Sequence, residues 1–195
     1  KKIVSNESRI VVVDNGSPNE SGAQLEKEFR DDITVHVLLN EKNLGLANGN
    51  NVGYRYAREV CNADTSVVMN NDGLIRQDNG EEVLTQYIES SGGDVIAPDI
   101  INKLGMHQNP YRDSRYPTGK AIKLMVMNDI KRAFISSNFG WDYYKKIKSG
   151  KREINIGNKE LPDRCDNAVP HGSCIVFSKR YVEQEIYAFR PDTFM

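Results

Sequence analysis

Short apolar runs and amphipathic stretches alternate along the first half of the chain. The run RIVVV at residues 9–13 is rich in β-branched side chains and ends at an Asp-Asn-Gly turn, which predicts a buried strand. Residues 33–37 alternate apolar and polar side chains, a period of two that predicts a second strand. A third strand is expected at residues 66–69 and a fourth at residues 94–98.

Helices are expected between these strands. Leu25 and Phe29 recur at four-residue spacing after Ser21, which predicts a helix with Ser21 as its N-cap. Apolar residues at helical spacing predict further helices over residues 46–60 and from residue 78. Strands that alternate with helices are typical of an α/β fold with a mostly parallel sheet, in which ligands bind where the strands end.

The second half of the chain is less regular. Residues 100–116 predict a hairpin or an ordered loop, and residues 120–148 contain helical stretches. Residues 169–177 predict a late strand, followed by a short helix from Lys179.

The composition narrows the class of protein. The 26 Lys and Arg residues nearly balance the 27 Asp and Glu residues, so we expect no nucleic-acid partner of the kind that a globally basic protein binds. The cysteines Cys61, Cys165 and Cys174 form no CxxC pair, which fits a reducing compartment better than a disulfide framework. No apolar run reaches the roughly 18 residues of a spanning helix, so the protein is expected to be soluble or peripheral.

Asp14 follows the first predicted strand, at the edge where an α/β sheet binds ligands. A carboxylate there accepts a hydrogen bond from the ring N–H of uracil, thymine or guanine and suits the N3 atom of cytosine poorly. Taken alone, an Asx-type turn organised by Asp14 and Ser17 is the simpler interpretation, because strand-Asp-Asn-Gly is common turn punctuation.

A second signal is the segment NEKNLGLANGNNVG at residues 40–53. Its glycines recur every four residues, fall near one another on a helix face and permit close approach of a ligand or of a neighbouring backbone. Its asparagines add amide donors and acceptors. The segment is neither a GxGxxG fingerprint nor a P-loop, so ligand binding and tight helix-on-sheet packing both stay open.

Asn70 and Asp72 lie two residues apart just after the third predicted strand. Side chains at this spacing can reach the same ligand. One carboxylate with one amide oxygen suffices for Mg²⁺ or Mn²⁺ only when substrate phosphates also hold the ion. Locally, an Asn-Asp-Gly turn without a ligand is the simpler alternative.

In this order and spacing, VVVDNGS, NLGLANGNNVG and MNND resemble the motifs of family 2 glycosyltransferases, in particular the bacterial polysaccharide and rhamnosyl-type enzymes. The segments VIAPDIIN, HQNPYR and HGSCIVFSKRYV extend the resemblance over nearly the whole chain. It implies a GT-A fold, a three-layer α/β sandwich with a mostly parallel central sheet, here truncated at both ends. It also implies one glycosyltransferase domain over residues 1–195, with a nucleotide-sugar-binding half at residues 1–98 and an acceptor-side half at residues 99–195.

The resemblance implies a UDP- or dTDP-linked sugar as donor. Asp14 would bind the nucleobase, with Asn15 and Ser17 shaping its pocket, and the glycine- and asparagine-rich segment would lie beside the nucleoside and the sugar. The implied donor-binding residues are Asp14, Asn15, Ser17, Asn43, Gly45, Asn48 and Asn70.

The resemblance also assigns the transfer chemistry. Asp72 would hold Mn²⁺ or Mg²⁺ as the last acid of the family's DxD motif, whose first position is Asn70 here, so the motif has one formal charge fewer. A direct, inverting displacement needs a base for the acceptor hydroxyl. His171, beside Gly172 and Ser173 on the acceptor side, is a candidate base, and a structural histidine is the alternative.

The acceptor is expected to be a saccharide or lipid-linked saccharide in cell-surface polysaccharide synthesis, in the cytoplasm at the inner face of the plasma membrane. Residues 119–152 carry nine Lys and Arg against two Asp, with apolar side chains interleaved. This pattern fits contact with an anionic membrane surface, and it equally fits an ordinary solvated basic face.

The ends of the chain suggest that parts of the family pattern are missing. The family's first strand would precede Lys1, and FRPDTFM resembles the segment before the family's acidic catalytic base, which would follow Met195. We therefore expect residues 1–195 alone to be catalytically inactive and to leave an open edge in the sheet.

Two other functions fit less of the sequence. A sugar-phosphate nucleotidyltransferase shares the layered architecture but needs a Gly-rich, basic loop after the first strand, where this chain has the acidic Asp14 turn. A non-catalytic binding or interaction domain would keep the fold with a vestigial nucleotide pocket. Stabilisation by UDP or dTDP with Mn²⁺ separates a transferase, active or relic, from an interaction module.

Overall fold

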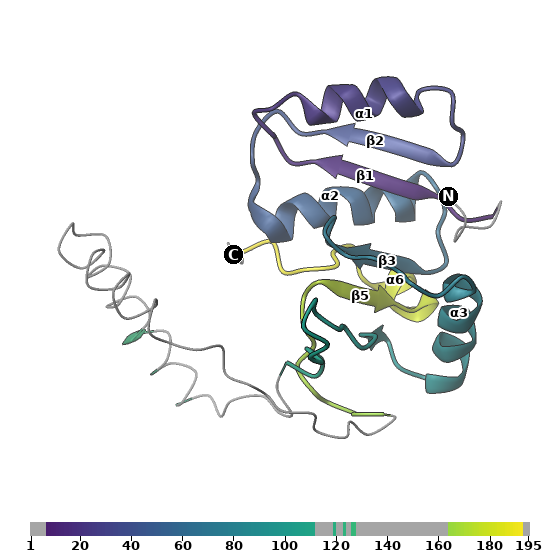
Figure 1. Cartoon of the computed structure of the whole chain (residues 1–195), viewed down its shortest axis with the longest axis vertical. Coiled ribbons are helices and arrows are strands. Elements are labelled where there is room, and N and C mark those ends of the chain that lie inside the picture. Colours follow the sequence, from purple (N-terminus) through teal and green to yellow (C-terminus); the bar gives the residue numbers. More distant parts are fainter. Residues whose placement is uncertain (1–6, 112–118, 120–122, 124–125, 128–163, 193–195) are drawn as a thin grey trace. The chain divides into compact units, whose positions relative to one another are not determined.

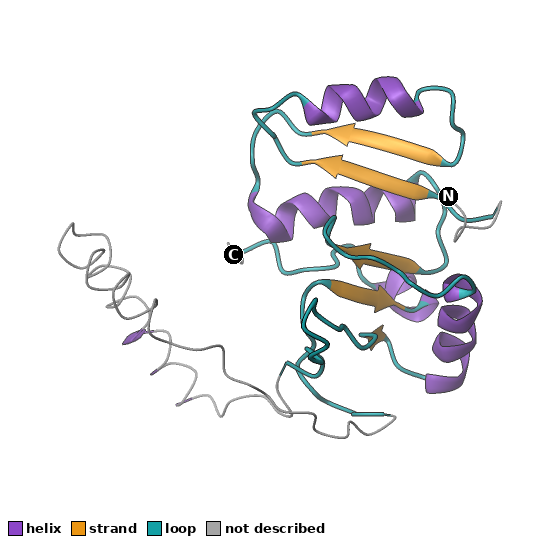
Figure 2. Cartoon of the chain, viewed as in Figure 1, coloured by secondary structure: helices purple, strands orange, loops and turns teal. Residues whose placement is uncertain are grey.

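The computed structural model describes residues 7–111, 119, 123, 126–127 and 164–192 (Figures 1 and 2). The chain forms two compact units, residues 1–98 with 172–195 and residues 99–171. Residues 172–195, which the sequence analysis assigned to the acceptor half, thus pack with residues 1–98. The elements of this first unit are β1 (Ile10–Asp14), α1 (Ser21–Phe29), β2 (Val35–Leu39), α2 (Gly45–Glu59), β3 (Ser66–Met69), α3 (Gly80–Ser91), β4 (Val95–Ile96), β5 (Cys174–Phe177) and α6 (Lys179–Gln184).

The strands β1 and β2 form a parallel pair, with Val12 opposite Val37. Helix α1 packs mainly on β2, and α2 packs on both β1 and β3. The sequence predicts a buried β1, yet all five of its residues are only half-buried. Within the described residues β1 has a ladder partner on one edge alone, which leaves its other edge without a neighbouring strand.

The strands β3, β5 and β4 form a second sheet in that order. Val68 lies opposite Ile175 and Val95 opposite Phe177, and both pairings are antiparallel. Since β3 and β4 are both antiparallel to β5, they run in the same direction, and β5 alone is reversed. The expected parallel pairing is observed for β1 with β2, whereas β3 and β4 each pair with β5 in the antiparallel direction.

The core of this unit lies between α2, β5 and α6. Tyr54, Phe177 and Val182 are almost completely buried, and the ring centroids of Tyr54 and Phe177 lie 5.5 Å apart, edge to face. The Tyr54 hydroxyl donates a hydrogen bond to the Glu185 carbonyl at 3.0 Å. Burial raises the pKa of Tyr54 to about 12, so the hydroxyl stays protonated and keeps this bond.

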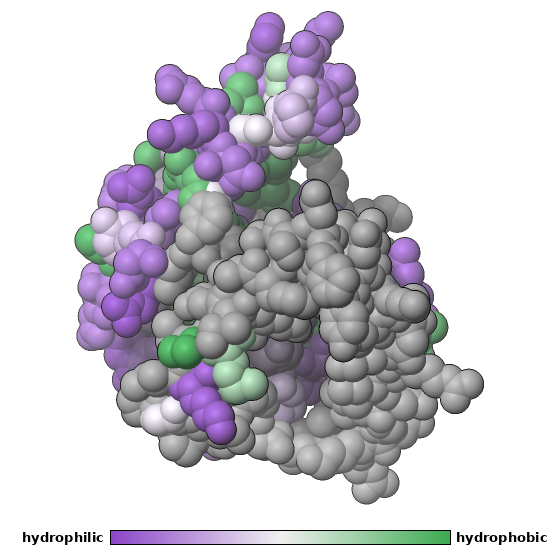
Figure 3. Space-filling model, turned by 90° about the vertical axis from the view of Figure 1, so that its left-hand side faces the viewer, coloured by the Kyte–Doolittle hydropathy of each residue, from purple (hydrophilic) through white to green (hydrophobic). Residues whose placement is uncertain are grey.

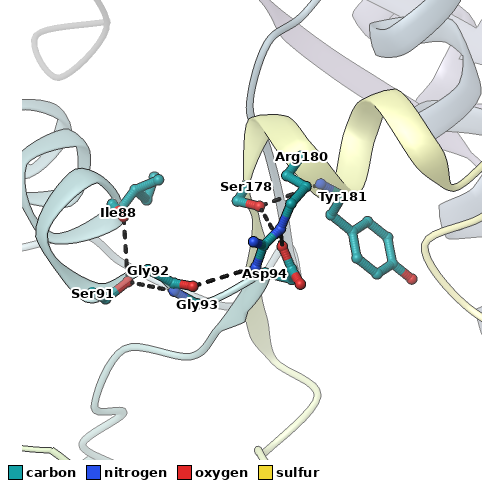
Figure 4. A network of polar contacts seen from close by, with 8 residues as sticks. All are labelled: Ile88, Ser91, Gly92, Gly93, Asp94, Ser178, Arg180 and Tyr181. Atoms are coloured by element: carbon teal, nitrogen blue, oxygen red, sulfur yellow. Dashed lines mark hydrogen bonds and ion pairs between the residues drawn. The ribbon is translucent and has the colours of Figure 1, made fainter.

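A polar cluster joins β4 to the start of α6 (Figure 4). The Arg180 guanidinium donates to the Asp94 carboxylate at 2.6 Å, and the Ser178 backbone N–H donates to the Asp94 carbonyl at 2.9 Å. The hydrogen bond from Arg180 lowers the pKa of Asp94. Ser178 is also the N-cap of α6 and accepts from the Tyr181 N–H. Asp94 therefore fixes where α6 begins.

Several local predictions are confirmed and others are corrected. Residues 101–107 form a short antiparallel hairpin, which is one of the two forms that the sequence predicts for residues 100–116. The late strand is limited to residues 174–177. Ser21 is not the N-cap of α1, since Glu20 holds that position without a side-chain cap and the Ser21 hydroxyl donates to Asp14 instead. No helix among the described residues is long and apolar enough to span a membrane.

Candidate functional site

Asp14 ends β1 and organises the turn that follows it. One carboxylate oxygen accepts from the Ser17 backbone N–H at 2.7 Å, and the other accepts from the Ser21 hydroxyl at 3.3 Å. The Ser17 hydrogen bond is the main reason why the pKa of Asp14 is lowered from 3.8. Asp14 is therefore ionised at neutral pH. Each carboxylate oxygen keeps capacity for a further donor, so the turn and a ligand role are compatible.

Asn15 joins this turn to the loop before α2. Its side-chain oxygen accepts from the Asn40 amide and from the Leu44 N–H, both at 3.1 Å. Its side-chain nitrogen donates to the Asn43 side chain and to the Gly45 carbonyl, also at 3.1 Å. Both halves of the Asn15 amide are thus used within the protein. Asn15 is thus a hydrogen-bonded hub and does not point a free amide outward, and its role in shaping a nucleobase pocket stays a prediction.

Two glycines permit the close contacts around this hub. Gly16 has φ of 73°, and a Cβ there would lie 2.5 Å from the Lys42 backbone. A Cβ at Gly49 would lie 2.7 Å from the side-chain nitrogen of Asn15. Gly53, one turn further along α2, approaches Val13 of β1 in the same way, at 2.8 Å. The glycine spacing thus serves the packing of α2 on the end of β1, and the packing places residues 40–45 beside Asp14.

The other predicted donor residues lie at the start of α2. The Asn43 side-chain oxygen accepts from the Gly45 N–H at 2.8 Å, and Gly45 has φ of 79°, which forms the tight entry to the helix. Asn48, one turn into α2, donates to the Leu44 carbonyl at 3.4 Å and to the Pro191 carbonyl at 3.2 Å. The structure therefore brings Asp14, Asn15, Asn43, Gly45 and Asn48 together at one edge of the unit.

This edge is the side on which β1 and β2 end and α2 begins, at the left of Figure 1. Figure 3 views the molecule from this side, where the coloured residues are mainly hydrophilic with a few hydrophobic ones between them. A polar surface at the carboxyl ends of parallel strands suits a polar ligand such as a nucleotide.

Asn70 and Asp72 follow β3, as the sequence predicts. The Asn70 N–H donates to the Ser173 carbonyl at 2.9 Å, and the Gly73 N–H donates to the Asn70 carbonyl at 3.1 Å. The predicted metal position and the predicted acceptor-side residue Ser173 are thus adjacent through their backbones. The side chain of Asp72 is exposed. Gly172 is exposed as well, with open space where a Cβ would stand.

The turn after β3 offers few ligand atoms for a metal ion. Within the part of the chain that the structure describes, no group of three or more His, Cys, Asp or Glu side chains is placed to hold one. Asp72 and the Asn70 amide provide oxygen ligands of the kind that Mg²⁺ and Mn²⁺ prefer. They fit an ion that a diphosphate also coordinates, and they do not form a complete protein cage.

His171 belongs to the second unit, where it contacts the HQNPYR segment. Its backbone N–H donates to the Asn109 side-chain oxygen at 2.6 Å, and its ring lies 6.1 Å from that of Tyr111. In the same segment His107 pairs with Asp99 at 2.6 Å. The structure thus joins two segments that are far apart in the sequence, and the two roles considered for His171, a base and a structural histidine, both stay predictions.

One hollow among the described residues lies away from the predicted site. It is an open groove of about 560 Å³ between β2 and α2, and its lining includes Val37, Tyr56 and Val60. Of the residues around the Asn15 hub it includes Asn40 alone. We place the candidate site at the hub, because the groove is shallow and contains none of the predicted donor-binding residues.

Sequence reasoning missed one group of residues near the site. Residues 189–191 lie against α2 through hydrogen bonds to Asn48 and Asn51. The two asparagines are visible in the sequence as part of an asparagine-rich motif. Their partners, Pro191 and Phe189, lie 143 and 138 positions later in the sequence, and no local pattern links them.

The basic segment at residues 119–152 lies almost entirely outside the described residues, which include only positions 119, 123, 126 and 127 of it. Its predicted contact with a membrane surface therefore stays a prediction.

Comparison with known proteins bears on the whole arrangement. The model of the family "Glycosyl transferase family 2" matches residues 3–184. The chain is 29% identical over 120 residues to the "Low-salt glycan biosynthesis hexosyltransferase Agl10" of Haloferax volcanii, a match that covers 62% of this chain and 36% of that protein. It is 25% identical over 191 residues to the "Glycosyltransferase GlyG" of Streptococcus pneumoniae serotype 4, covering 93% of this chain and 60% of that protein.

A third relative, human "Tripartite motif-containing protein 29", is 25% identical over 138 residues and is matched over 24% of its length. No solved structure matches the chain. The chain spans about a third and three fifths of the lengths of the two transferases.

Proposed function

We propose that this chain, which belongs to glycosyl transferase family 2, binds a nucleoside-diphosphate sugar beside the Asn15 hub and takes part in transferring the sugar to an acceptor. The observation that carries the proposal is the hub itself. Its four hydrogen bonds tie the end of β1 to the chain that leaves β2 and enters α2. Ligands of α/β proteins bind at this edge.

The family has the GT-A fold, which confirms the fold predicted from the motifs and agrees with the α/β architecture described above. The names of two relatives, a hexosyltransferase and a glycosyltransferase, denote the same class of reaction, the transfer of a sugar.

Asp14 is the residue we assign to the nucleobase. It is ionised because its pKa is lowered by the Ser17 hydrogen bond, so it can only accept hydrogen bonds. Uracil and thymine present a ring N–H at N3, whereas cytosine presents an acceptor there. Guanine also presents a ring N–H, so Asp14 disfavours only cytosine, and the proposal of UDP- or dTDP-linked sugars rests in addition on the resemblance to polysaccharide and rhamnosyl-type enzymes.

Family 2 enzymes generally use a divalent metal ion. We assign Asp72, with the Asn70 amide, to hold Mn²⁺ or Mg²⁺ together with the diphosphate of the donor. When bound, the ion would neutralise the charge that develops on the leaving diphosphate.

The proposed transfer is a direct, inverting displacement. An acceptor hydroxyl oxygen forms a bond to the anomeric carbon, while the bond from that carbon to the diphosphate oxygen breaks and its electron pair leaves with the diphosphate. The hydroxyl proton passes to a base, for which His171 is the candidate within this chain. Gly172 and Ser173 are assigned to the acceptor side.

The acceptor we propose is a saccharide or lipid-linked saccharide of a cell-surface polysaccharide, reached from the cytoplasmic face of the plasma membrane. Residues 119–152 are the segment proposed to contact that membrane, on the basis of their positive charge. Co-sedimentation with anionic vesicles at low salt tests this contact, and an absence of binding contradicts it.

Titration calorimetry with UDP, dTDP and CDP, each with and without MnCl₂, tests the donor assignment. We expect UDP or dTDP to bind more tightly than CDP, because only their rings donate to Asp14, and we expect Mn²⁺ to strengthen binding. Equal affinity for UDP and CDP contradicts the role of Asp14. Binding of none of these nucleotides contradicts the proposed function and favours an interaction module.

A further inference from the structure

One face of α2 is hydrogen-bonded to the backbone of α6 and of the chain that follows it. Four α2 side chains donate to main-chain carbonyls there. The donor and acceptor residues are Arg58 with Val182, Tyr54 with Glu185, Asn51 with Phe189, and Asn48 with Pro191.

These contacts have a consistent direction. From Arg58 back to Asn48 the helix runs toward its own N-terminal end, over about 15 Å. Over the same four contacts the segment bonded to α2 runs from Val182 to Pro191. The chain after α6 therefore runs antiparallel to α2 and is led to the end of the helix where the Asn15 hub lies. In Figure 1 the yellow segment after α6 runs toward the side on which α2 begins.

Asn51 makes the most complete of these contacts. Its side-chain nitrogen donates to the Phe189 carbonyl at 2.7 Å, and its side-chain oxygen accepts from the Phe189 N–H at 2.9 Å. Asn51 is only 3% exposed, so water does not replace a partner that is lost. The Phe189 ring also packs edge to face on Phe177 of the core. The position of Phe189 is therefore fixed by its backbone and by its side chain.

Asn48 connects this segment to the candidate donor site. Its side-chain nitrogen lies within hydrogen-bond distance of the Pro191 carbonyl and of the Leu44 carbonyl. The Leu44 N–H is itself a donor to Asn15. The Asn48 side chain thus connects Pro191 to the loop that surrounds the hub. The adjacent Arg190 and Asp192 form an ion pair at 3.1 Å.

We propose that Asn51 is a positioning residue, which holds residues 189–192 against α2 so that this segment forms one wall of the nucleotide-sugar site. The inference rests on the proposed function and extends it. It adds residues 189–192 to the donor site, and it assigns to Asn51 a role exerted through the backbone of Phe189 and not through contact with substrate.

The variant Asn51→Asp tests this role, with Asn50→Asp as its matched control. Ionised, the new carboxylate of N51D cannot donate to the Phe189 carbonyl. Protonated, it can donate and accept as the amide does. The ionised carboxylate still accepts from the Phe189 N–H but repels the Phe189 carbonyl. Burial favours the neutral form of a carboxyl group, so lowering the pH restores the bond donated to that carbonyl. Asn50 is the neighbouring amide on the same helix and is only half-buried.

The first measurement is hydrogen exchange, expressed as a protection factor so that pH values can be compared. At pH 8 we expect the Phe189 amide of N51D to lose at least about tenfold in protection, with recovery near pH 5, whereas N50D behaves as the wild type at both pH values. Unchanged protection of Phe189 in N51D at pH 8 overturns the proposal.

The second measurement adds UDP or dTDP with MnCl₂. We expect the nucleotide to raise the protection of residues 189–192 in the wild type and in N50D, and to leave N51D at pH 8 without this response. A wild type that binds nucleotide with no change at residues 189–192 overturns the inference and leaves the proposed function intact. A wild type that binds no nucleotide overturns the proposed function, and the inference with it.

The third measurement is sugar transfer by the full-length natural protein. We expect N51D to lower kcat by about tenfold at pH 8 with little change in the KM of the donor, and to approach the wild type near pH 5. An equal loss in N50D overturns the proposal. If N51D does not fold, Asn48→Ala replaces it, since this change releases only the Pro191 end of the segment. We then expect the loss of protection at the Arg190 and Asp192 amides alone, since Pro191 has no N–H, and normal exchange at both overturns the proposal.

Discussion

The corner at the end of β1 has the sequence Asp-Asn-Gly, and the corner at the end of β3 has the similar sequence Asn-Asp-Gly. The two corners differ in how many of their polar side chains are hydrogen-bonded within the protein. At the first, Asn15 uses both halves of its amide and Asp14 holds the turn through Ser17. At the second, the turn is held by the backbone of Asn70, and the Asp72 side chain is exposed.

This difference fits the roles that we propose for the two corners. A corner whose polar groups are already paired is rigid before a ligand arrives, which suits recognition of a planar nucleobase. A corner with an exposed carboxylate needs a ligand to complete it, which suits a metal ion that arrives with the diphosphate. Substitutions at the first corner should therefore change stability and binding together, and those at the second should change the response to metal alone.

The largest effect is expected for Asn15→Ala. The change removes the acceptor of the Leu44 N–H and of the Asn40 amide, and it leaves the Asn43 side-chain oxygen and the Gly45 carbonyl without this donor. We therefore expect the free energy of unfolding to fall by about 2 to 4 kcal/mol and nucleotide binding to be lost. Urea unfolding and calorimetry measure the two effects. Asn19→Ala is the control, because the Asn19 side chain accepts one long hydrogen bond of 3.3 Å in an exposed turn. Equal losses in both variants would contradict the hub.

Gly49→Ala should destabilise the protein by about 1 to 3 kcal/mol, because the added methyl group overlaps Asn15. In an ordinary helix the same change stabilises by up to about 1 kcal/mol, so the sign of the effect is diagnostic. Gly172→Ala has open space for its methyl group and should change stability by less than about 0.5 kcal/mol. A Gly49→Ala protein as stable as the wild type would show that α2 does not press on Asn15.

Asp14→Asn should weaken binding of UDP or dTDP about tenfold, because an amide can present a donor to a ring N–H that itself donates. The same variant has a pH signature. The folded-state pKa of Asp14 is lowered from 3.8, so its contribution to stability is present above that value and is lost as the pH falls through the folded-state pKa. The fall of stability on acidification should be less steep in the variant. Urea midpoints between pH 6 and pH 3 measure it, and identical slopes would count against this role.

Asp72→Ala should have the smallest effect on the fold, within about 0.5 kcal/mol, because the side chain is exposed. It should nevertheless abolish the strengthening of nucleotide binding by Mn²⁺. Asp78→Ala, an exposed acid six positions later, should leave that strengthening unchanged. Persistent enhancement by Mn²⁺ in Asp72→Ala would place the metal ligands elsewhere.

The local elements and the membership of the family could be predicted from the sequence. Runs such as RIVVV and the four-residue spacing of Leu25 and Phe29 act within ten residues, which is the range over which patterns predict strands and helices. The motifs at residues 14, 43 and 70 could be assigned for a related reason, since each directly follows a strand or opens a helix.

Features that depend on distant partners could not be predicted. Strand β5, at residues 174–177, pairs antiparallel with β3, at residues 66–69, so its direction is set by a partner far away in the sequence. Ser21 has the residue type of an N-cap, but its hydroxyl donates to the Asp14 carboxylate. The contact of Asn51 with Phe189 joins residues 138 positions apart. For Ser21 and Asn51, the polar side chain pairs with a residue outside its own helix, which the local pattern does not show.

The measurement that tests the central claim most directly is a titration of the chain with UDP or dTDP, followed at each backbone amide by NMR. We expect the largest chemical-shift changes at residues 14–17 and 43–48, around the Asn15 hub, with smaller ones at residues 70–73 when Mg²⁺ is added. Changes confined to the groove between β2 and α2, at residues 37–39 and 55–60, would contradict the assignment of the site.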